Sequence, residues 1–198
     1  MGHMFSCARY ISIAGHTMRE DKWEKKAYGK GIELQGKTLG IVGFGRIGQH
    51  LGVMAKAIGM KVVAFDIFHI PGIEEQLGIP YVEMDELLAQ SDFISVHAPA
   101  VDGGALISAE NIAKMKDGVV IVNTSRGTNV GEAALLAALE SGKVRAAGLD
   151  VYADEPATNK ALYSHPMVSC TPHIGAATNE AQKRIGAEIV DIITNFGK

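Results

Sequence analysis

Short apolar runs recur along most of this chain, and each is separated from the next by a segment with helical periodicity. Aliphatic residues dominate the runs, which is typical of strands covered on both faces of a parallel sheet. Strands that alternate with helices in this way predict a single α/β domain built on a doubly wound parallel sheet, with layers in the order α/β/α. The predicted strands are 39–42, 61–66, 92–96, 118–123, 144–150 and 167–170.

The segments between the runs carry apolar residues at helical spacing. Ahead of the first strand, residues from about 5 to 26 predict one amphipathic helix, because Ile11, Ala14 and Met18 fall at that spacing. Glycines within 29–36 then break the pattern. The other predicted helices are 46–58, 85–90, 108–115, 132–140 and 178–195.

Gly43, Gly45 and Gly48 form a glycine-rich turn between the first strand and the helix after it. In that context the first glycine permits a tight turn, the second lets backbone approach a pyrophosphate, and the third lets helix pack on strand. Asp66 ends the next strand, where an acid can accept the ribose hydroxyls. The acid would repel the 2′-phosphate of NADP, and no Arg or Lys directly follows it, so NAD is favoured over NADP. Taken alone, Asp66 could instead cap a strand–loop corner.

Arg126, Glu155 and His173 each follow a strand in the C-terminal half of the chain. Loops after parallel strands line one crevice, so the three side chains can converge there. Hydride removal from a 2-hydroxy acid needs a base for the hydroxyl proton, which an imidazole supplies. A carboxylate would hold that ring, and an arginine would bind the substrate carboxylate. Taken alone, each of the three residues could have a purely structural role. Their order along the chain favours a role in acid/base chemistry.

Composition adds mainly exclusions. Of 198 residues, 47% are hydrophobic and 21% charged, and the net charge of −3 predicts no nucleic-acid surface. The two cysteines show no metal or redox spacing, so we predict no metal site and a reducing, cytoplasmic setting. No apolar run reaches the roughly 20 residues of a membrane span. Residues 1–4 look like an expression-vector remnant, so the predicted domain spans 5–198.

Taken together, these motifs resemble the cofactor-binding domain of the D-isomer-specific 2-hydroxyacid dehydrogenases. They follow one another in the family's order and reach across nearly the entire chain, which makes the resemblance specific. It implies a Rossmann-like domain that binds NAD and a substrate that is a small 2-hydroxy or 2-oxo acid. The matching stretches are 39–48, 122–127, 148–152 with 154–156, and 171–176.

The resemblance also implies a role for each site residue. His173 would be the acid/base, Glu155 its partner, and Arg126 the cation that orients the substrate. Asp150 would lie near the nicotinamide amide, while His97 is interpreted as a backbone anchor outside the catalytic set. Contacts with NAD are implied for Gly43, Gly45, Arg46, Ile47, Gly48, Asp66, Ala98, Pro99, Thr124, Ser125, Arg126, Asp150, His173, Gly175 and Ala176.

Two departures from the family matter. Gly131-Glu132 lacks the acid that usually precedes this glutamate, which we expect to alter only a helix cap. The substrate-binding domain, built in the family from sequence before and after this region, is absent from this chain. We therefore expect NAD binding to survive and turnover to be very low, because one wall of the cleft is missing.

The identity of the 2-hydroxy acid stays open at this stage, because specificity in the family rests largely on the absent domain. An alternative of another class is a non-enzymatic, NAD-responsive interaction module, like the dehydrogenase-related transcriptional corepressors. The resemblance also implies a homodimer through the cofactor domain. The first helix and residues 105–107 are the predicted contributors to that interface.

Overall fold

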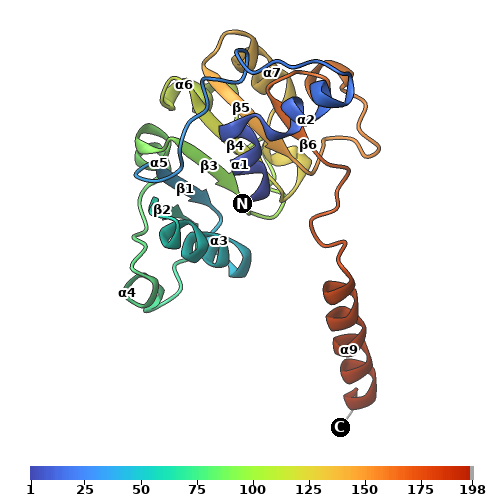
Figure 1. Ribbon diagram of the computed structural model, residues 1–198. Coiled ribbons are helices and arrows are strands. Elements are labelled where there is room, and N and C mark those ends of the chain that lie inside the picture. Colours follow the sequence, from blue (N-terminus) through green and yellow to red (C-terminus); the bar gives the residue numbers. More distant parts are fainter. Residues whose placement is uncertain (197–198) are drawn as a thin grey trace.

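The computed structural model describes residues 1–196, and its centre is one parallel sheet covered by helices (Figure 1). The strand order is β2-β1-β3-β4-β5-β6, so the winding direction reverses between β1 and β3. In open sheets of this kind, ligands bind outside the carboxyl ends of the strands at that reversal. The predicted strands are confirmed within one residue at each end. They are β1 (Thr38–Val42), β2 (Lys61–Phe65), β3 (Phe93–Val96), β4 (Val119–Asn123), β5 (Val144–Leu149) and β6 (Val168–Cys170).

Each face of the sheet has its own core, which confirms the three-layer architecture. Leu39 and Ile41 of β1 pack with Leu51, in a cluster that α1 (Gly2–Arg9) and α3 (Arg46–Ala57) cover. Val42 belongs to the opposite cluster, with Leu87. Because successive strand residues point to opposite faces, a continuous apolar run is buried on both. The opposite face is covered by α5 (Met84–Gln90), α6 (Ala109–Lys114) and α7 (Glu132–Glu140).

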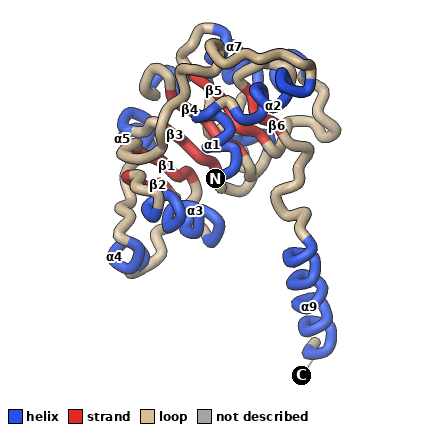
Figure 2. Tube along the Cα trace, viewed as in Figure 1, coloured by secondary structure: helices blue, strands red, loops and turns tan. Residues whose placement is uncertain are grey.

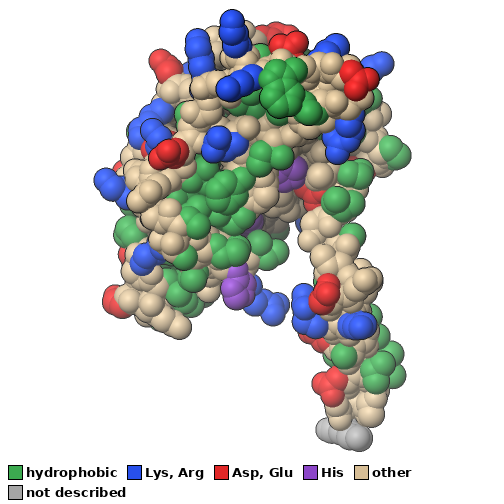
Figure 3. Space-filling view, viewed as in Figure 1, with side chains coloured by type: hydrophobic (Ala, Val, Ile, Leu, Met, Phe, Trp, Pro, Cys, Tyr) green, Lys and Arg blue, Asp and Glu red, His purple; other side chains and the backbone are tan. Residues whose placement is uncertain are grey.

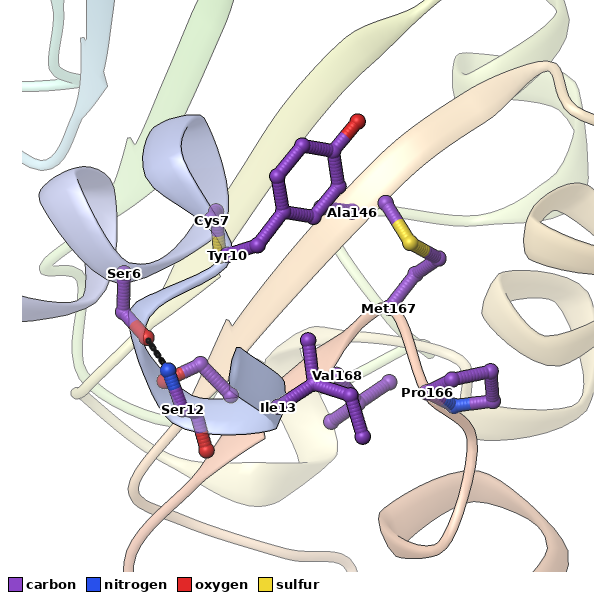
Figure 4. Close-up of a pocket in the computed structure, with 10 residues that line it drawn as sticks. Ser6, Cys7, Tyr10, Ser12, Ile13, Ala146, Pro166, Met167 and Val168 are labelled. Atoms are coloured by element: carbon purple, nitrogen blue, oxygen red, sulfur yellow. Dashed lines mark hydrogen bonds between the residues drawn. The ribbon is translucent and has the colours of Figure 1, made fainter. Parts of the chain in front are cut away.

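The prediction of one helix from about residue 5 to 26 is wrong. Two helices, α1 and α2 (Ile11–Arg19), meet at Tyr10, which has a left-handed backbone with φ of 58°. Tyr10 turns there because its ring and hydroxyl contact Arg145, and because the hydroxyl also donates to Lys30 O. Ser12 N donates to Ser6 Oγ across the turn (Figure 4). Tertiary contacts therefore override the helical periodicity.

Figure 4 also shows the space between Tyr10, Cys7 and Met167, where the N-terminal helices meet β5 and β6. At about 10 Å³ it is no larger than a single water requires. Cys7 is buried at this contact, and burial raises the pKa of its thiol to about 12. We therefore interpret this space as a packing contact between helix and sheet.

Residues 1–4 are part of the fold, so leaving them out of it is wrong. Helix α1 starts at Gly2, Met4 is fully buried in the cluster under α1 and α3, and His3 bonds to Ser169 and Thr171. Composition does not reveal this, because the segment is held by contacts with residues more than 160 positions away in the sequence, Ser169 and Thr171. Whether these residues come from a vector stays a prediction.

The last helix, α9 (Asn179–Asn195), confirms the predicted helix but extends away from the sheet (Figures 1 and 2). None of its residues is buried, and apolar side chains such as Ile189 and Ile193 are exposed. Figure 3 shows the open space between α9 and the body of the domain. In the described residues, no helix is long and apolar enough to cross a membrane. Three further short elements are α4 (Ile73–Leu77), η1 (Gly127–Asn129) and α8 (Lys160–Tyr163).

Candidate active site

The glycine-rich turn has a separate steric reason at each glycine. A Cβ on Gly43, whose φ is +92°, would lie 2.5 Å from Ala98 N, so this turn touches the loop after β3. A Cβ on Gly48 would lie 2.4 Å from Gly43 O, which shows how closely α3 packs on the turn. A Cβ on Gly45 would meet nothing within 4 Å. The N-terminus of α3 therefore faces open space, as a phosphate-binding turn requires.

Asp66 connects this turn to the loop after β2. Its Oδ2 accepts from Phe44 N at 2.6 Å, and its Oδ1 accepts from Phe68 N at 3.0 Å. The capping alternative is thus part of what this carboxylate does. Each carboxylate oxygen has two acceptor positions, so both oxygens keep capacity for a hydroxyl donor.

Two cavities lie along the carboxyl ends of the strands, on either side of His97. The Asp66 cavity, about 190 Å³, is lined in part by Gly43, Asp66, Ala98 and Pro99. The Asp150 cavity, about 500 Å³, is lined in part by Thr124, Asp150 and Gly175. His97 lines both, so the two cavities adjoin. An extended dinucleotide that crosses the point where the winding reverses fits this arrangement.

Asp150 is the centre of a hydrogen-bonded network at the base of the Asp150 cavity. Its Oδ1 accepts from Thr171 Oγ1 at 2.5 Å and from Ile174 N, while Oδ2 accepts from Gly175 N at 2.8 Å. Burial alone would raise the pKa of Asp150, but these donors outweigh it and lower the pKa. Oδ2 has one partner here, so it can accept a further N–H.

The Thr171 hydroxyl fixes the tautomer of His3. That hydroxyl has one proton, which lies toward Asp150, so Thr171 Oγ1 must accept from His3 Nε2 at 3.1 Å. The other ring nitrogen, Nδ1, then accepts from Ser169 Oγ at 3.1 Å. Burial lowers the pKa of His3, in agreement with this neutral tautomer.

The pH dependence of the free energy of unfolding tests whether His97 is buried as a neutral imidazole. Its Nε2 bonds to Ser95 Oγ at 2.8 Å, and burial lowers its pKa from 6.5 to about 4. Between those pH values the unfolded chain binds a proton that the folded chain does not, so stability falls as pH falls. From pH 7 to pH 5 this contribution is about 1–2 kcal/mol. Urea unfolding at both pH values should show His97→Asn losing less stability than the unsubstituted chain; equal losses would contradict a buried neutral imidazole.

His173 and Glu155 form the pair that the sequence predicts to meet. His173 Nδ1 lies 2.7 Å from Glu155 Oε2, and Tyr152 N donates to the other carboxylate oxygen at 3.2 Å. The bond from His173 and then that from Tyr152 lower the pKa of Glu155. An ionised carboxylate only accepts, so Nδ1 carries the proton and Nε2 is left to exchange one.

The pair faces a third cavity, of about 450 Å³, lined also by Tyr152 and Cys170. The His173 side chain is 54% exposed and that of Glu155 is 39% exposed. A hydrogen-bonded charge pair gains little in such open surroundings. Exclusion of water from this cavity would strengthen the interaction between His173 and Glu155.

Arg126 lies in the same corner but does not touch the pair. Its Nη1 donates to Ser125 O at 2.7 Å, and its side chain is exposed. The next residue, Gly127, is packed so tightly on Tyr152 that a Cβ would lie 1.8 Å from Tyr152 O. The loop that carries Arg126 therefore abuts the loop that carries Glu155.

The structure divides the predicted cofactor contacts into groups. Some line the Asp66 and Asp150 cavities, whereas Ser125 is buried behind them and Gly48 packs beneath the turn. Five others line neither of these cavities and are exposed. They are Arg46, Ile47, Arg126, His173 and Ala176.

Sequence reasoning misses His3 and Asn129 and gives His97 only the role of a backbone anchor. The position of His97, directly after β3, was a usable signal for a residue at the cavity edge. His3 comes from the segment that composition excluded. Asn129 lies one turn beyond Arg126 and is fully buried, which no local pattern indicates.

A doubly wound sheet with this turn, acid and histidine–glutamate pair defines the dinucleotide-binding domain of an oxidoreductase. Residues 1–175 match the profile of the family described as D-isomer specific 2-hydroxyacid dehydrogenase, NAD binding domain. The chain belongs to this family, and its cofactor is NAD. The match includes residues 1–4 and ends before α9.

Individual relatives agree with the family. The chain is 51% identical to a hydroxypyruvate reductase of Thermotoga maritima, covering 98% of this chain and 63% of the relative. It is 45% identical to a D-3-phosphoglycerate dehydrogenase of Mycobacterium tuberculosis, covering 96% and 36%. A solved D-lactate dehydrogenase from Aquifex aeolicus, complexed with NAD and lactic acid, superposes with a TM-score of 0.88 at 32% identity, covering 98% of this chain and 63% of that one. The chain thus spans less than two thirds of these relatives' length.

Proposed function

We propose that this chain is the cofactor domain of an enzyme that interconverts a D-2-hydroxy acid and its 2-oxo acid. The observation that carries the proposal is the 2.7 Å contact between His173 and Glu155, at the same edge of the sheet as the Asp150 cavity. When bound, NAD supplies the position that accepts or gives the hydride. The protein must then bind the substrate, orient it and move one proton.

Each of the three predicted residues has a part in that chemistry. His173 Nε2 takes the hydroxyl proton during oxidation and returns it during reduction. Glu155 holds the ring in the tautomer that leaves Nε2 free and stabilises its charged form. Arg126 swings from Ser125 O to bind the substrate carboxylate bidentately.

For the substrate we propose a three-carbon acid of the glycerate type. The matching stretches resemble D-3-phosphoglycerate dehydrogenase most, an enzyme that oxidises 3-phospho-D-glycerate in the first step of serine synthesis. The relative at 51% identity supports hydroxypyruvate instead, which differs from 3-phosphohydroxypyruvate, the product of that oxidation, by the absence of the C3 phosphate. The two substrates share their C1–C2 chemistry. The test is a steady-state comparison of the two substrates. It uses the chain alone and a chimera that carries this chain between the flanking segments of the Thermotoga maritima relative. The comparison separates substrate specificity from cofactor binding.

Asp66→Ala tests the cofactor assignment. Loss of hydrogen bonds between hydroxyls and an ionised acceptor, each worth about 1.5–3 kcal/mol, predicts about ten- to hundredfold weaker NADH binding. Fluorescence titration of the 198-residue chain measures it. Asp92→Ala is the matched control, because Asp92 also accepts a backbone N–H, from Thr38 at 2.8 Å, but before β3 rather than after β2. Equal affinity of the two variants would refute the assignment.

We also propose that the protein works in a reducing compartment, which suits the free thiols of Cys7 and Cys170.

We further propose self-association through α2 and the segment after it. Ile11 is 57% exposed and Trp23 is 77% exposed, so this face is apolar. Ile107, predicted as a contributor, is fully buried and belongs to the core. Sedimentation of the chain and of Ile11→Asp should show a dimer weakened by the substitution; a monomer in both would sink the idea.

A further inference from the structure

Asn129 connects two loops that face the cofactor cavities without lining either cavity itself. It lies in η1 and is fully buried. Its Nδ2 lies 2.9 Å from Ala98 O, 3.1 Å from Pro99 O and 3.1 Å from Ser125 Oγ. One amide group therefore joins the loop after β3 to the loop after β4.

The network around it shows that Asn129 acts as a donor. The Ser125 hydroxyl donates to Asn123 Oδ1 at 2.8 Å, so its oxygen accepts from Asn129. A flipped amide would set its oxygen against two carbonyl oxygens. In residues 1–196, Oδ1 of Asn129 is buried and has no hydrogen-bond partner, which costs free energy. The side-chain amide is thus oriented by the hydrogen bonds that its two N–H protons donate. Because its oxygen is left unpaired, stability alone does not explain why this amide is buried.

The joined loops carry residues of both cavities. Ala98 and Pro99 line the Asp66 cavity, and Thr124, next to Ser125, lines the Asp150 cavity. The main chain of the second loop is tied as well. The carbonyl of Arg126 accepts from Asn129 N at 3.1 Å and from Asn123 Nδ2 at 2.8 Å.

We infer that Asn129 is a positioning residue that sets the spacing between the two cofactor-facing loops and so tunes NAD affinity. The inference rests on NAD binding by this chain and assigns no contact between Asn129 and the cofactor. Its effect passes through the carbonyls of Ala98 and Pro99 and the hydroxyl of Ser125.

Asn129→Asp tests it with the same shape and no donor at neutral pH. A carboxylate against two carbonyl oxygens should weaken NADH binding about tenfold or more at pH 8. Burial raises the pKa of such a carboxyl, so at pH 5.5 its O–H donates and part of the affinity returns. Asn195→Asp, on exposed α9, is the control and should bind like the unsubstituted chain at both pH values.

NADH fluorescence titration and thermal unfolding of each chain separate the outcomes. A merely structural role would lower the melting temperature and leave the affinity of the folded protein and its pH dependence unchanged. If Asn129→Asp does not fold, Asn129→Ser, which keeps one donor, should bind about threefold or more weakly. Unchanged affinity in a folded variant overturns the inference. Absence of NADH binding by the unsubstituted chain would instead refute the cofactor assignment, and this inference with it.

Discussion

Replacement of His173 by alanine is expected to lower kcat about 10²- to 10⁴-fold, while NADH affinity changes far less. The measurement is steady-state reduction of a 2-oxo acid by the chimera described above. The loss follows from the geometry: Nδ1 is bonded to Glu155, so Nε2 is the ring nitrogen left to give the proton that the new hydroxyl needs. No other imidazole contacts Glu155 in residues 1–196.

The matched control is His165→Ala. His165 precedes β6, whereas His173 follows it, and its Nδ1 accepts from Met167 N at 3.2 Å. Its loss should therefore affect stability and leave kcat nearly unchanged. If both histidine variants kept the activity of the parent, the acid/base assignment would be wrong.

Glu155→Gln in the same chimera should lower kcat, but by less than His173→Ala does. The amide oxygen can still accept from Nδ1 and so orient the ring, but it no longer provides the negative charge that Glu155 places 2.7 Å from the ring. Steady-state kinetics of the two variants measure the difference. A kcat equal to that of the parent would mean that the charge of Glu155 has no part in the reaction.

The strands could be predicted from sequence because burial on both faces leaves few polar residues in them. The break at Tyr10 could not, because it depends on contacts with Arg145 and Lys30, which lie far away in the sequence. Helix α4 has five residues and α8 has four, too few to show a helical period. The direction of α9 depends on what its apolar face packs against, which periodicity alone does not encode.

The sequence predicts the residues of the candidate site only where a functional side chain lies in the loop directly after a strand. Glu155 and His173 were expected to converge, and they do, because parallel strands deliver their following loops to one edge. The side-chain direction of Arg126 and the buried donor role of Asn129 depend on loop packing that sequence spacing does not reveal. The roles of all these residues stay predictions until the variants are measured.

Gly127→Ala is expected to destabilise the domain, because a Cβ at Gly127 would make a shorter contact than a Cβ at any other glycine of the described residues. A Cβ at Gly127 would lie 1.8 Å from Tyr152 O and 1.9 Å from Tyr152 C, and both are backbone atoms that cannot rotate away. Either the loop after β4 or the loop after β5 must move. Overpacking of this kind costs about 1–3 kcal/mol or more, measurable as a lower free energy of unfolding in urea.

The same displacement should separate Arg126 from Glu155 and so lower kcat in the chimera beyond the loss expected from unfolding. Gly131→Ala is the control, because its Cβ would lie at an ordinary 3.6 Å from Ile107 O in the same part of the fold. It should change stability by less than about 1 kcal/mol, because Gly131 is the N-cap of α7 and has no side-chain cap bond to lose. A Gly127→Ala variant with the stability and kcat of the Gly131→Ala variant would show that the two loops yield without cost, and that their contact does not position the site.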